Sequence, residues 1–210
     1  MSNYLVATVT VRGTGPLLQH AFGLDTIPAT GERPSRTGAA GNDPEEWRRS
    51  ARVTLEGQLY LEPAAAYATI REAAKYTKKG RASLQGPVAA TLQILESRVL
   101  LDRWLPGSNG GQTFDLKTIT APSRDSAQPV YLDVRGVRNP ATKGRNVRYR
   151  VAAAPGWQCV FNLRWDKTLV TASQMEAILH DSGKLVGLGD GRSIGFGRFE
   201  IGSLKIREDG

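Results

Sequence analysis

The chain has little of what many enzymes and secreted proteins depend on. Its 210 residues include one cysteine, two histidines and two methionines, and aromatic residues make up 7% of them. A single cysteine, Cys159, excludes an intramolecular disulfide framework and favours a reducing compartment. No His/Cys cluster and no Cys-x-x-Cys is present in the sequence, so it indicates neither a metal nor another cofactor.

Apolar runs are short, and the common nucleotide motifs are missing. No run approaches the roughly 20 residues that a membrane-spanning helix needs. The first residues, Met-Ser-Asn-Tyr-Leu-Val-Ala, lack the basic start and apolar stretch of a signal peptide. No Gly-Lys-Ser or Gly-Lys-Thr occurs, which argues against a nucleotide-hydrolysing Walker loop. We therefore expect a cytoplasmic protein with no membrane partner.

What the chain has in excess is positive charge. Its 28 Lys and Arg residues outweigh 20 Asp and Glu residues, which gives a formal net charge of +8. Such a balance favours a polyanionic partner, although solubility alone is the simpler reason for it.

Glycine is concentrated near the C-terminus, between a helical pattern and a strand pattern. Five glycines lie within eleven residues, at Gly187, Gly189, Gly191, Gly195 and Gly197. Glycine permits positive φ and close approach of another chain, and free N–H groups in such a loop can form a concave anion site. Arg192 and Arg198 would complete a phosphate site there. On this basis, valine at Gly195 or Gly197 is expected to abolish binding and leave the fold mostly intact.

Hydrophobic periodicity predicts an α+β fold. Strand patterns cover residues 4–12, 52–61, 87–101, 130–137, 146–153, 157–166 and 199–206, with Gly202 as a bulge in the last one. One helix is predicted over 63–76, with Pro63 as its first residue. Another begins at Thr171, which forms a capping box with Gln174 and is followed by a buried stripe that reaches Leu185 and Val186. The order fits a ferredoxin-like (RRM-like) βαββαβ core with irregular and β-hairpin insertions.

The same reading predicts one domain over residues 1–210. A flexible insertion is expected at about 23–50, where glycine, proline and arginine are frequent and periodicity is low. A second, thumb-like insertion is expected at about 102–153, with a basic tip between its two strands.

Two basic clusters accompany the glycines. Residues 71–81 hold five basic residues and one acidic one, and residues 135–150 hold six basic residues and no acidic one. Aromatic residues such as Tyr76, Tyr149, Trp47 and Phe196 lie among them, as suits single strands whose bases stack while their phosphates meet charges. The candidate contacts are Lys75, Lys78, Lys79, Arg81, Arg138, Lys143, Arg145, Arg148 and Arg150. The alternative is that each cluster is a solvated surface.

Evidence for catalysis is thin. His20 follows the first strand, where a general base could stand near bound RNA, and we include it among the nucleic-acid contacts. His180 is expected to be structural, and Cys159 to be a small core residue. No catalytic residue is assigned.

The run Gly187-Leu-Gly-Asp-Gly-Arg-Ser-Ile-Gly-Phe-Gly-Arg-Phe-Glu-Ile201 resembles the glycine-rich loop and following strand of the RAMP superfamily, the ferredoxin-like RNA-binding proteins of CRISPR systems. Gly13-Thr-Gly-Pro-Leu-Leu18 after the first strand is compatible with that group. The insertions and basic hairpin look most like its backbone subunit, which polymerises along guide RNA and inserts a thumb between segments of it. The pattern also resembles small uncharacterised phage and prophage proteins.

The resemblance implies a non-enzymatic binder of single-stranded nucleic acid, with RNA preferred, that acts in a homo-oligomer or a multi-subunit ribonucleoprotein. Three alternatives remain open. They are a phage protein of replication or recombination that binds single-stranded DNA, a metal-independent endoribonuclease that uses His20, and a structural phage protein.

Overall fold

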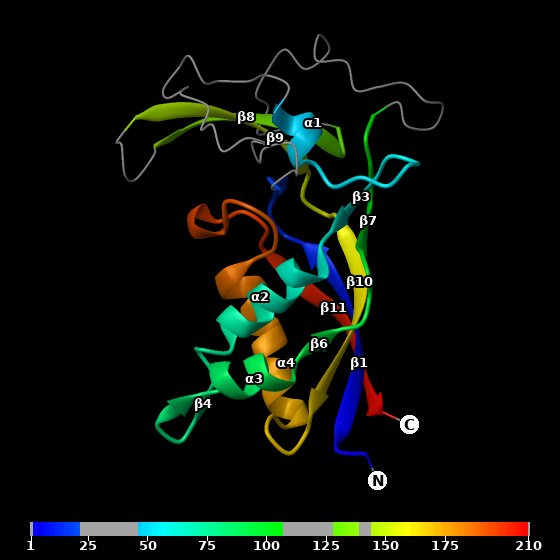
Figure 1. Cartoon of the computed structure of the whole chain (residues 1–210), viewed down its shortest axis with the longest axis vertical. Coiled ribbons are helices and arrows are strands. Elements are labelled where there is room, and N and C mark those ends of the chain that lie inside the picture. The colour runs from blue at the N-terminus through cyan, green and yellow to red at the C-terminus, as the bar shows by residue number, and fades with distance from the viewer. Residues whose placement is uncertain (1, 22–45, 107–127, 139–143, 210) are drawn as a thin grey trace, which may run out of the picture.

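A computed structural model describes residues 2–21, 46–106, 128–138 and 144–209. Its largest element is an antiparallel sheet of six strands (Figure 1). The strands are β1 (Tyr4–Gly13), β3 (Gln58–Leu61), β6 (Gln93–Ile94), β7 (Val99–Trp104), β10 (Gln158–Asp166) and β11 (Phe199–Glu208). They follow the order β11-β1-β10-β7-β3, and β6 pairs with the far part of β10. Together with its helices, the sheet makes the chain an α+β protein, as predicted.

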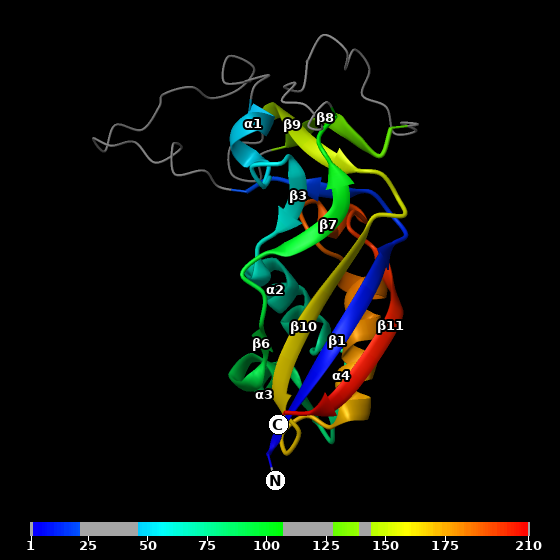
Figure 2. The ribbon, with the colours of Figure 1, turned by 90° about the vertical axis from the view of Figure 1, so that its right-hand side faces the viewer.

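Three helices, α2 (Pro63–Ala73), α3 (Gln85–Thr91) and α4 (Ala172–Asp181), cover one face of this sheet. Figure 2 shows the sheet from its other face, with these helices behind it. The main core lies between the two layers, where β1 and β10 contribute Val9, Phe161 and Leu163, and the helices contribute Ile70 and Ile178. A π-helical turn, Ser182–Val186, extends α4 toward the glycines.

Smaller elements occupy the two ends of the long axis (Figure 1). At one end, β2 (Leu17–Gln19), β8 (Val130–Arg138) and β9 (Arg145–Ala153) form a three-stranded sheet, and α1 (Glu46–Ser50) packs beside β9. At the other end, β4 (Lys78–Lys79) and β5 (Ala82–Ser83) form a short hairpin.

Several local predictions are confirmed. Pro63 is the first residue of α2. The Thr171 hydroxyl accepts from the Gln174 N–H at 3.3 Å, and the Gln174 side chain accepts from the Thr171 N–H at 2.9 Å, which completes the capping box. In the last strand, Ile201 pairs with Val11 and Ser203 with Thr10, so Gly202 is the extra residue of a bulge.

Other local predictions were wrong. Residues 87–101 do not form one strand, because Leu84, Val88 and Leu92 are spaced by four and bury one side of a helix, α3. Pro87 is tolerated because it lies in the first turn, where no helical hydrogen bond needs its N–H. Within 52–61, only residues 58–61 form a strand, since the chain turns back at residues 54–57 and Val53 bridges to Leu59. The helix predicted over 63–76 ends at Ala73, as α2. Leu185, predicted to be buried, is exposed.

The predicted insertions are only partly described. Within 23–50, residues 46–50 form α1, and the remainder lies outside the described residues. Within 102–153, the described parts are the end of β7 and the hairpin of β8 and β9.

Candidate nucleic-acid interface

The segment Gly187–Gly197, called the glycine loop below, joins the turn after α4 to β11. All five of its glycines have positive φ, with values from 69° to 93°. Side chains beyond glycine rarely adopt that region. The positive φ predicted for these glycines is therefore confirmed.

The close approach that these glycines permit is to the chain itself. A Cβ added at Gly197 would overlap the Leu188 carbonyl, and one at Gly187 would lie 2.6 Å from the Phe196 carbonyl oxygen. A Cβ at Gly189 would lie 2.5 Å from the carbonyl oxygen of Leu18 in β2. Only at Gly195, among the five, would a Cβ meet no described atom within 4 Å. Gly195 is thus the loop glycine that faces open space, and the expectation that Gly197→Val leaves the fold intact was wrong.

Most of the loop's N–H groups are also used within the chain. The Asp190 N–H donates to the Leu18 carbonyl at 2.8 Å, and the Gly197 N–H donates to the Pro16 carbonyl at 2.7 Å. Further N–H donors to carbonyl oxygens of the chain are Gly187, Leu188, Ile194, Gly195 and Phe196. A phosphate at this loop would therefore depend on side chains more than on these backbone donors.

The two arginines predicted to contact phosphate, Arg192 and Arg198, are held by the fold in different ways. Arg192 is partly buried, with Nη1 3.5 Å from the Thr69 hydroxyl of α2. Arg198 is also partly buried, and its Nη1 is buried without a hydrogen bond to any described atom. Its carbonyl oxygen accepts from the N–H groups of Thr14 and Gly15, which fixes the backbone where the loop enters β11.

Arg150 is a structural residue in this fold. Its side chain is 6% exposed, its Nη1 donates to Asp190 Oδ2 at 2.6 Å, and its Nη2 lies 3.9 Å from Asp133 Oδ1. Burial alone would raise the pKa of Asp190, but hydrogen bonds from Arg150 and from the Gly191 N–H outweigh it and hold that pKa below its ordinary value. Arg150, predicted from the sequence as a nucleic-acid contact, is therefore turned inward by two carboxylates and is not on an open surface.

Arg148 and His20 share one carboxylate. Glu46, at the start of α1, accepts from Arg148 and lies 3.1 Å from His20 Nε2. Burial tends to raise the pKa of Glu46, and hydrogen bonds from His20, the Tyr149 N–H and Arg148 lower it further than burial raises it. Glu46 therefore joins α1, β2 and β9 in the folded chain.

The outer end of the β8–β9 hairpin is exposed and basic. Arg138 and Arg145 are opposite each other in its register, and both are exposed. Lys143, which the sequence places at the tip, lies outside the described residues.

The other basic cluster is far from this hairpin. Lys78 and Lys79 form β4, Arg81 follows them, and all three are exposed. Lys75 is half-buried and pairs with Glu72 beside the Tyr76 ring. Figure 1 shows β4 and β8 at opposite ends of the long axis, so the structure does not bring the two clusters together.

The structure adds two residues that the sequence did not single out as a pair, Arg135 of β8 and Phe196 of the glycine loop. The Arg135 guanidinium carbon lies 4.6 Å from the centre of the Phe196 ring, and its Nε donates to both Asp133 oxygens at 2.7 and 2.8 Å. Phe196 also packs in a small apolar cluster with Leu18, Tyr131 and Ala152. The contact between Arg135 and Phe196 joins residues far apart in the sequence, so no local sequence pattern predicts it.

A hollow of about 320 Å³ lies at this junction and is called the loop–hairpin hollow below. It is lined by Pro16, Tyr131, Arg135, Ile194, Gly195 and Phe196. Ile194 is 67% exposed, and Gly195 leaves the backbone uncovered at the same place. A cation stacked on an aromatic ring beside open apolar surface is suited to a planar, negatively charged ligand.

The described residues give no sign of two other kinds of site. No group of three or more His, Cys, Asp or Glu side chains among them is placed to hold a metal ion. No helix in the same part of the chain is both long and apolar enough to cross a membrane.

Comparison with known proteins gives a distant structural likeness. No protein-family model matches the chain, and no curated protein matches it. Among solved structures, the chain is similar to a chain in a cryo-EM structure of the Type III-B Cmr-beta bound to cognate target RNA, with 12% identity and a TM-score of 0.47. The likeness covers 98% of this chain and 61% of the other, so the chain spans about three fifths of the length of that neighbour.

Proposed function

We propose that this protein is a non-enzymatic binder of single-stranded nucleic acid, with RNA preferred, built as a RAMP-like domain around a ferredoxin-like core. The observation that carries the proposal is the loop–hairpin hollow, where Arg135 lies over Phe196 beside exposed Ile194 and uncovered Gly195. Bases of a single strand stack on aromatic and guanidinium surfaces, whereas bases inside a duplex do not offer their faces.

The order of the elements supports the domain assignment. In a ferredoxin-like βαββαβ core, the first to fourth strands correspond here to β1, β7, β10 and β11, and α2 and α4 lie on one face. Their order in the sheet, β11-β1-β10-β7, is then 4-1-3-2. The preference for RNA rests on the resemblance of the segment from Gly187 to Ile201 to RAMP glycine loops.

Charge supplies the rest of the proposed surface. Arg138 and Arg145 extend the hairpin beyond the loop–hairpin hollow, and we assign phosphates to them and to Arg192 and Arg198, which are partly buried beside it. Lys75, Lys78, Lys79 and Arg81 form a second contact at the other end of the molecule, which only a longer strand reaches. A strand that spans both ends would continue onto a neighbouring copy, in a homo-oligomer or a larger ribonucleoprotein.

The test is the affinity for labelled oligonucleotides, measured by fluorescence anisotropy with RNA and DNA of the same mixed sequence. Arg135→Lys keeps the charge and loses the flat guanidinium over Phe196, so we expect affinity to fall about fivefold, equivalent to about 1 kcal/mol. Arg164→Lys is the matched control, because the Arg164 guanidinium carbon lies 4.3 Å from the centre of the Tyr4 ring on the main sheet, away from the loop. Equal losses in both variants, or no binding by the natural chain, would refute the proposal.

A further inference from the structure

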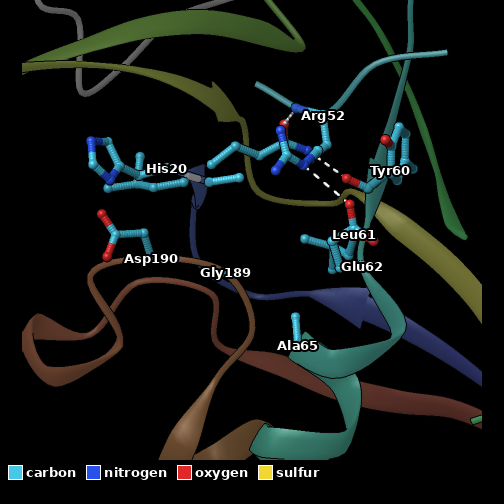
Figure 3. A pocket seen from close by; sticks show the side chains of 11 residues that line it. His20, Arg52, Tyr60, Leu61, Glu62, Ala65, Gly189 and Asp190 are labelled. Carbon is cyan, nitrogen blue, oxygen red and sulfur yellow. Dashed lines mark hydrogen bonds and ion pairs between the residues drawn. The ribbon is translucent and has the colours of Figure 1, made fainter. Parts of the chain in front are cut away.

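A second hollow borders the glycine loop on the side of β2, and it has its own chemistry. It encloses about 230 Å³ and is lined by Leu18, Gln19, His20, Ala21, Arg52, Tyr60, Leu61, Glu62, Ala65, Gly189 and Asp190. Figure 3 shows it with His20 and Asp190 on one side and with Arg52 and Glu62 on the other. It is called the base pocket below.

The size and floor of the base pocket suit one flat ring system. Pockets for drug-sized ligands typically enclose about 300–1,000 Å³, so a smaller ligand is expected here. Leu18, Leu61 and Ala65 provide apolar surface against which a planar face can be buried. A nucleobase is a ligand of this kind, because it combines a planar face with a polar edge.

The polar groups combine a fork of donors with carboxylate acceptors. Arg52 Nε lies 3.1 Å from Glu62 Oε1, the two side chains are 26% and 49% exposed, and both residues line the pocket. On the opposite side, Asp190 lies below the His20 ring with its carboxylate directed away from Arg52 (Figure 3), and its Oδ2 accepts from Arg150. A ligand here meets a guanidinium and a carboxylate next to each other.

We propose that the base pocket binds a single unstacked guanine. Guanine alone among the common bases presents two adjacent acceptors, O6 and N7, that match an arginine fork, together with N–H donors at N1 and N2 that a carboxylate accepts. Adenine would turn its amino group toward Arg52, and uracil would turn a carbonyl toward Glu62. The inference rests on the proposed function in one respect: the guanine is supplied by a single strand that is bound at the same loop.

The walls of the pocket are held in place before a ligand arrives. Gln19 is buried, and its side chain donates to the Tyr60 carbonyl at 3.0 Å and accepts from the Arg52 N–H at 2.7 Å. Gly189 lies directly against Leu18, which fixes the loop side. Prepositioned walls lower the cost of ordering that a bound base would otherwise impose.

The glycine loop also connects this pocket to the loop–hairpin hollow. Gly189 and Asp190 line the base pocket, whereas Gly195 and Phe196 line the other hollow. A strand held at the loop–hairpin hollow therefore lies along the same loop as the base pocket, and one of its bases can turn into it.

The experiment measures the affinity of oligouridine ten nucleotides long, unmodified or with one central G, A or C. We expect the single G to tighten binding roughly tenfold and A or C to change it less than threefold. Glu62→Gln should abolish the preference for G, because the carboxylate that accepts from N1 and N2 is lost. Glu62 precedes α2 without a capping hydrogen bond from its side chain, so this variant should fold. Glu176→Gln, which replaces an exposed carboxylate on α4, is the matched control and should keep the preference.

A parallel titration with free guanosine monophosphate and uridine monophosphate separates this proposal from the proposed function. If no oligonucleotide binds but guanosine monophosphate binds, and Glu62→Gln removes that binding, the base pocket stands and the strand-binding function fails. If strands bind without preference for G, or if the preference survives in both Glu62→Gln and Arg52→Lys, the base pocket is refuted. If neither strands nor guanosine monophosphate bind, both proposals are refuted.

Discussion

Arg150 Nη1 and Asp190 Oδ2 are 2.6 Å apart, and this charge-assisted hydrogen bond joins β9 of the small sheet to the glycine loop. The Arg150 side chain contacts the loop from the interior of the protein, where it is buried between Asp190 and Asp133. Arg135, two residues beyond Asp133 on β8, stacks on Phe196 of the same loop. The hairpin and the loop therefore form one structural unit, and the candidate interface lies on it.

Removing Asp190 should destabilise the fold without weakening the binding of oligouridine, which brings no guanine to the base pocket. Asp190→Ala leaves the buried Arg150 guanidinium with Asp133 alone, so we expect a loss of about 1.5–3 kcal/mol in the free energy of unfolding, measured in urea. Glu208→Ala breaks the exposed pair with Lys167 and should cost no more than about 1 kcal/mol. If Arg150 bound phosphate, Asp190→Ala would instead raise affinity and leave stability unchanged.

Much of the fold could be predicted from local pattern. The alternation predicted over 157–166, the capping box at Thr171 and the glycines of positive φ each depend on neighbours in sequence, and each was found, with the strand at Gln158–Asp166. The helix α3 was missed because its apolar spacing begins at Leu84, before a Gly-Pro pair that is typical of extended structure and turns.

The candidate site was harder to predict because its contacts cross long stretches of chain. The sequence marks Arg148 and Arg150 as basic, but it gives no sign that Glu46 and Asp190 would neutralise them. It likewise marks the glycines as close-contact positions, but it does not say that the contact is with Leu18 and Leu188. Runs of basic residues indicate a basic surface, and runs of glycine indicate close backbone contact. Only the tertiary structure shows which residues a given arginine or glycine contacts.

Two glycines of the loop should respond in opposite ways to alanine. Gly197→Ala places a Cβ on the Leu188 carbonyl, so we expect loss of the cooperative thermal transition or a large fall in Tm. Gly195→Ala meets no described atom and bears only the strain of a positive φ, about 1–2 kcal/mol. Circular dichroism melts of the two variants compare them directly.

The folded Gly195→Ala variant also tests the interface. Its added methyl group lies at the loop–hairpin hollow, so affinity for single strands should fall about threefold or more while the fold persists. Unchanged affinity would show that the strand does not approach the backbone at Gly195.

Stability should decline in acid through Glu46 and Asp190. Both carboxyl groups have a folded-state pKa below their ordinary values of 4.5 and 3.8. A lowered pKa means that the folded state favours the ionised form, so the contribution is complete above the ordinary pKa and is lost as pH falls below it. Urea unfolding between pH 7 and pH 3 should therefore show a fall below about pH 4.5.

The variants Glu46→Gln and Asp190→Asn identify the source of that fall. Each should be less stable than the natural chain at pH 7, and each should lose less stability on acidification. Parallel curves for the natural chain and both variants would assign the acid sensitivity to other carboxyl groups.

Salt dependence should separate the two basic ends of the molecule. Each phosphate contact of a single strand contributes a slope of about 0.7 in log affinity against log salt. Replacing Arg138 and Arg145 by glutamate removes two exposed charges beside the loop–hairpin hollow, so the slope should fall by about 1.4 for short and long strands alike.

Replacing Lys78 and Lys79 by glutamate changes the same charge at the opposite end, and it should lower the slope only for strands long enough to reach β4. Lys205→Glu with Arg207→Glu, on exposed positions of β11, is the control of equal charge and should leave the slope unchanged. If all three double variants lower the slope equally, binding follows net charge and no particular surface is involved.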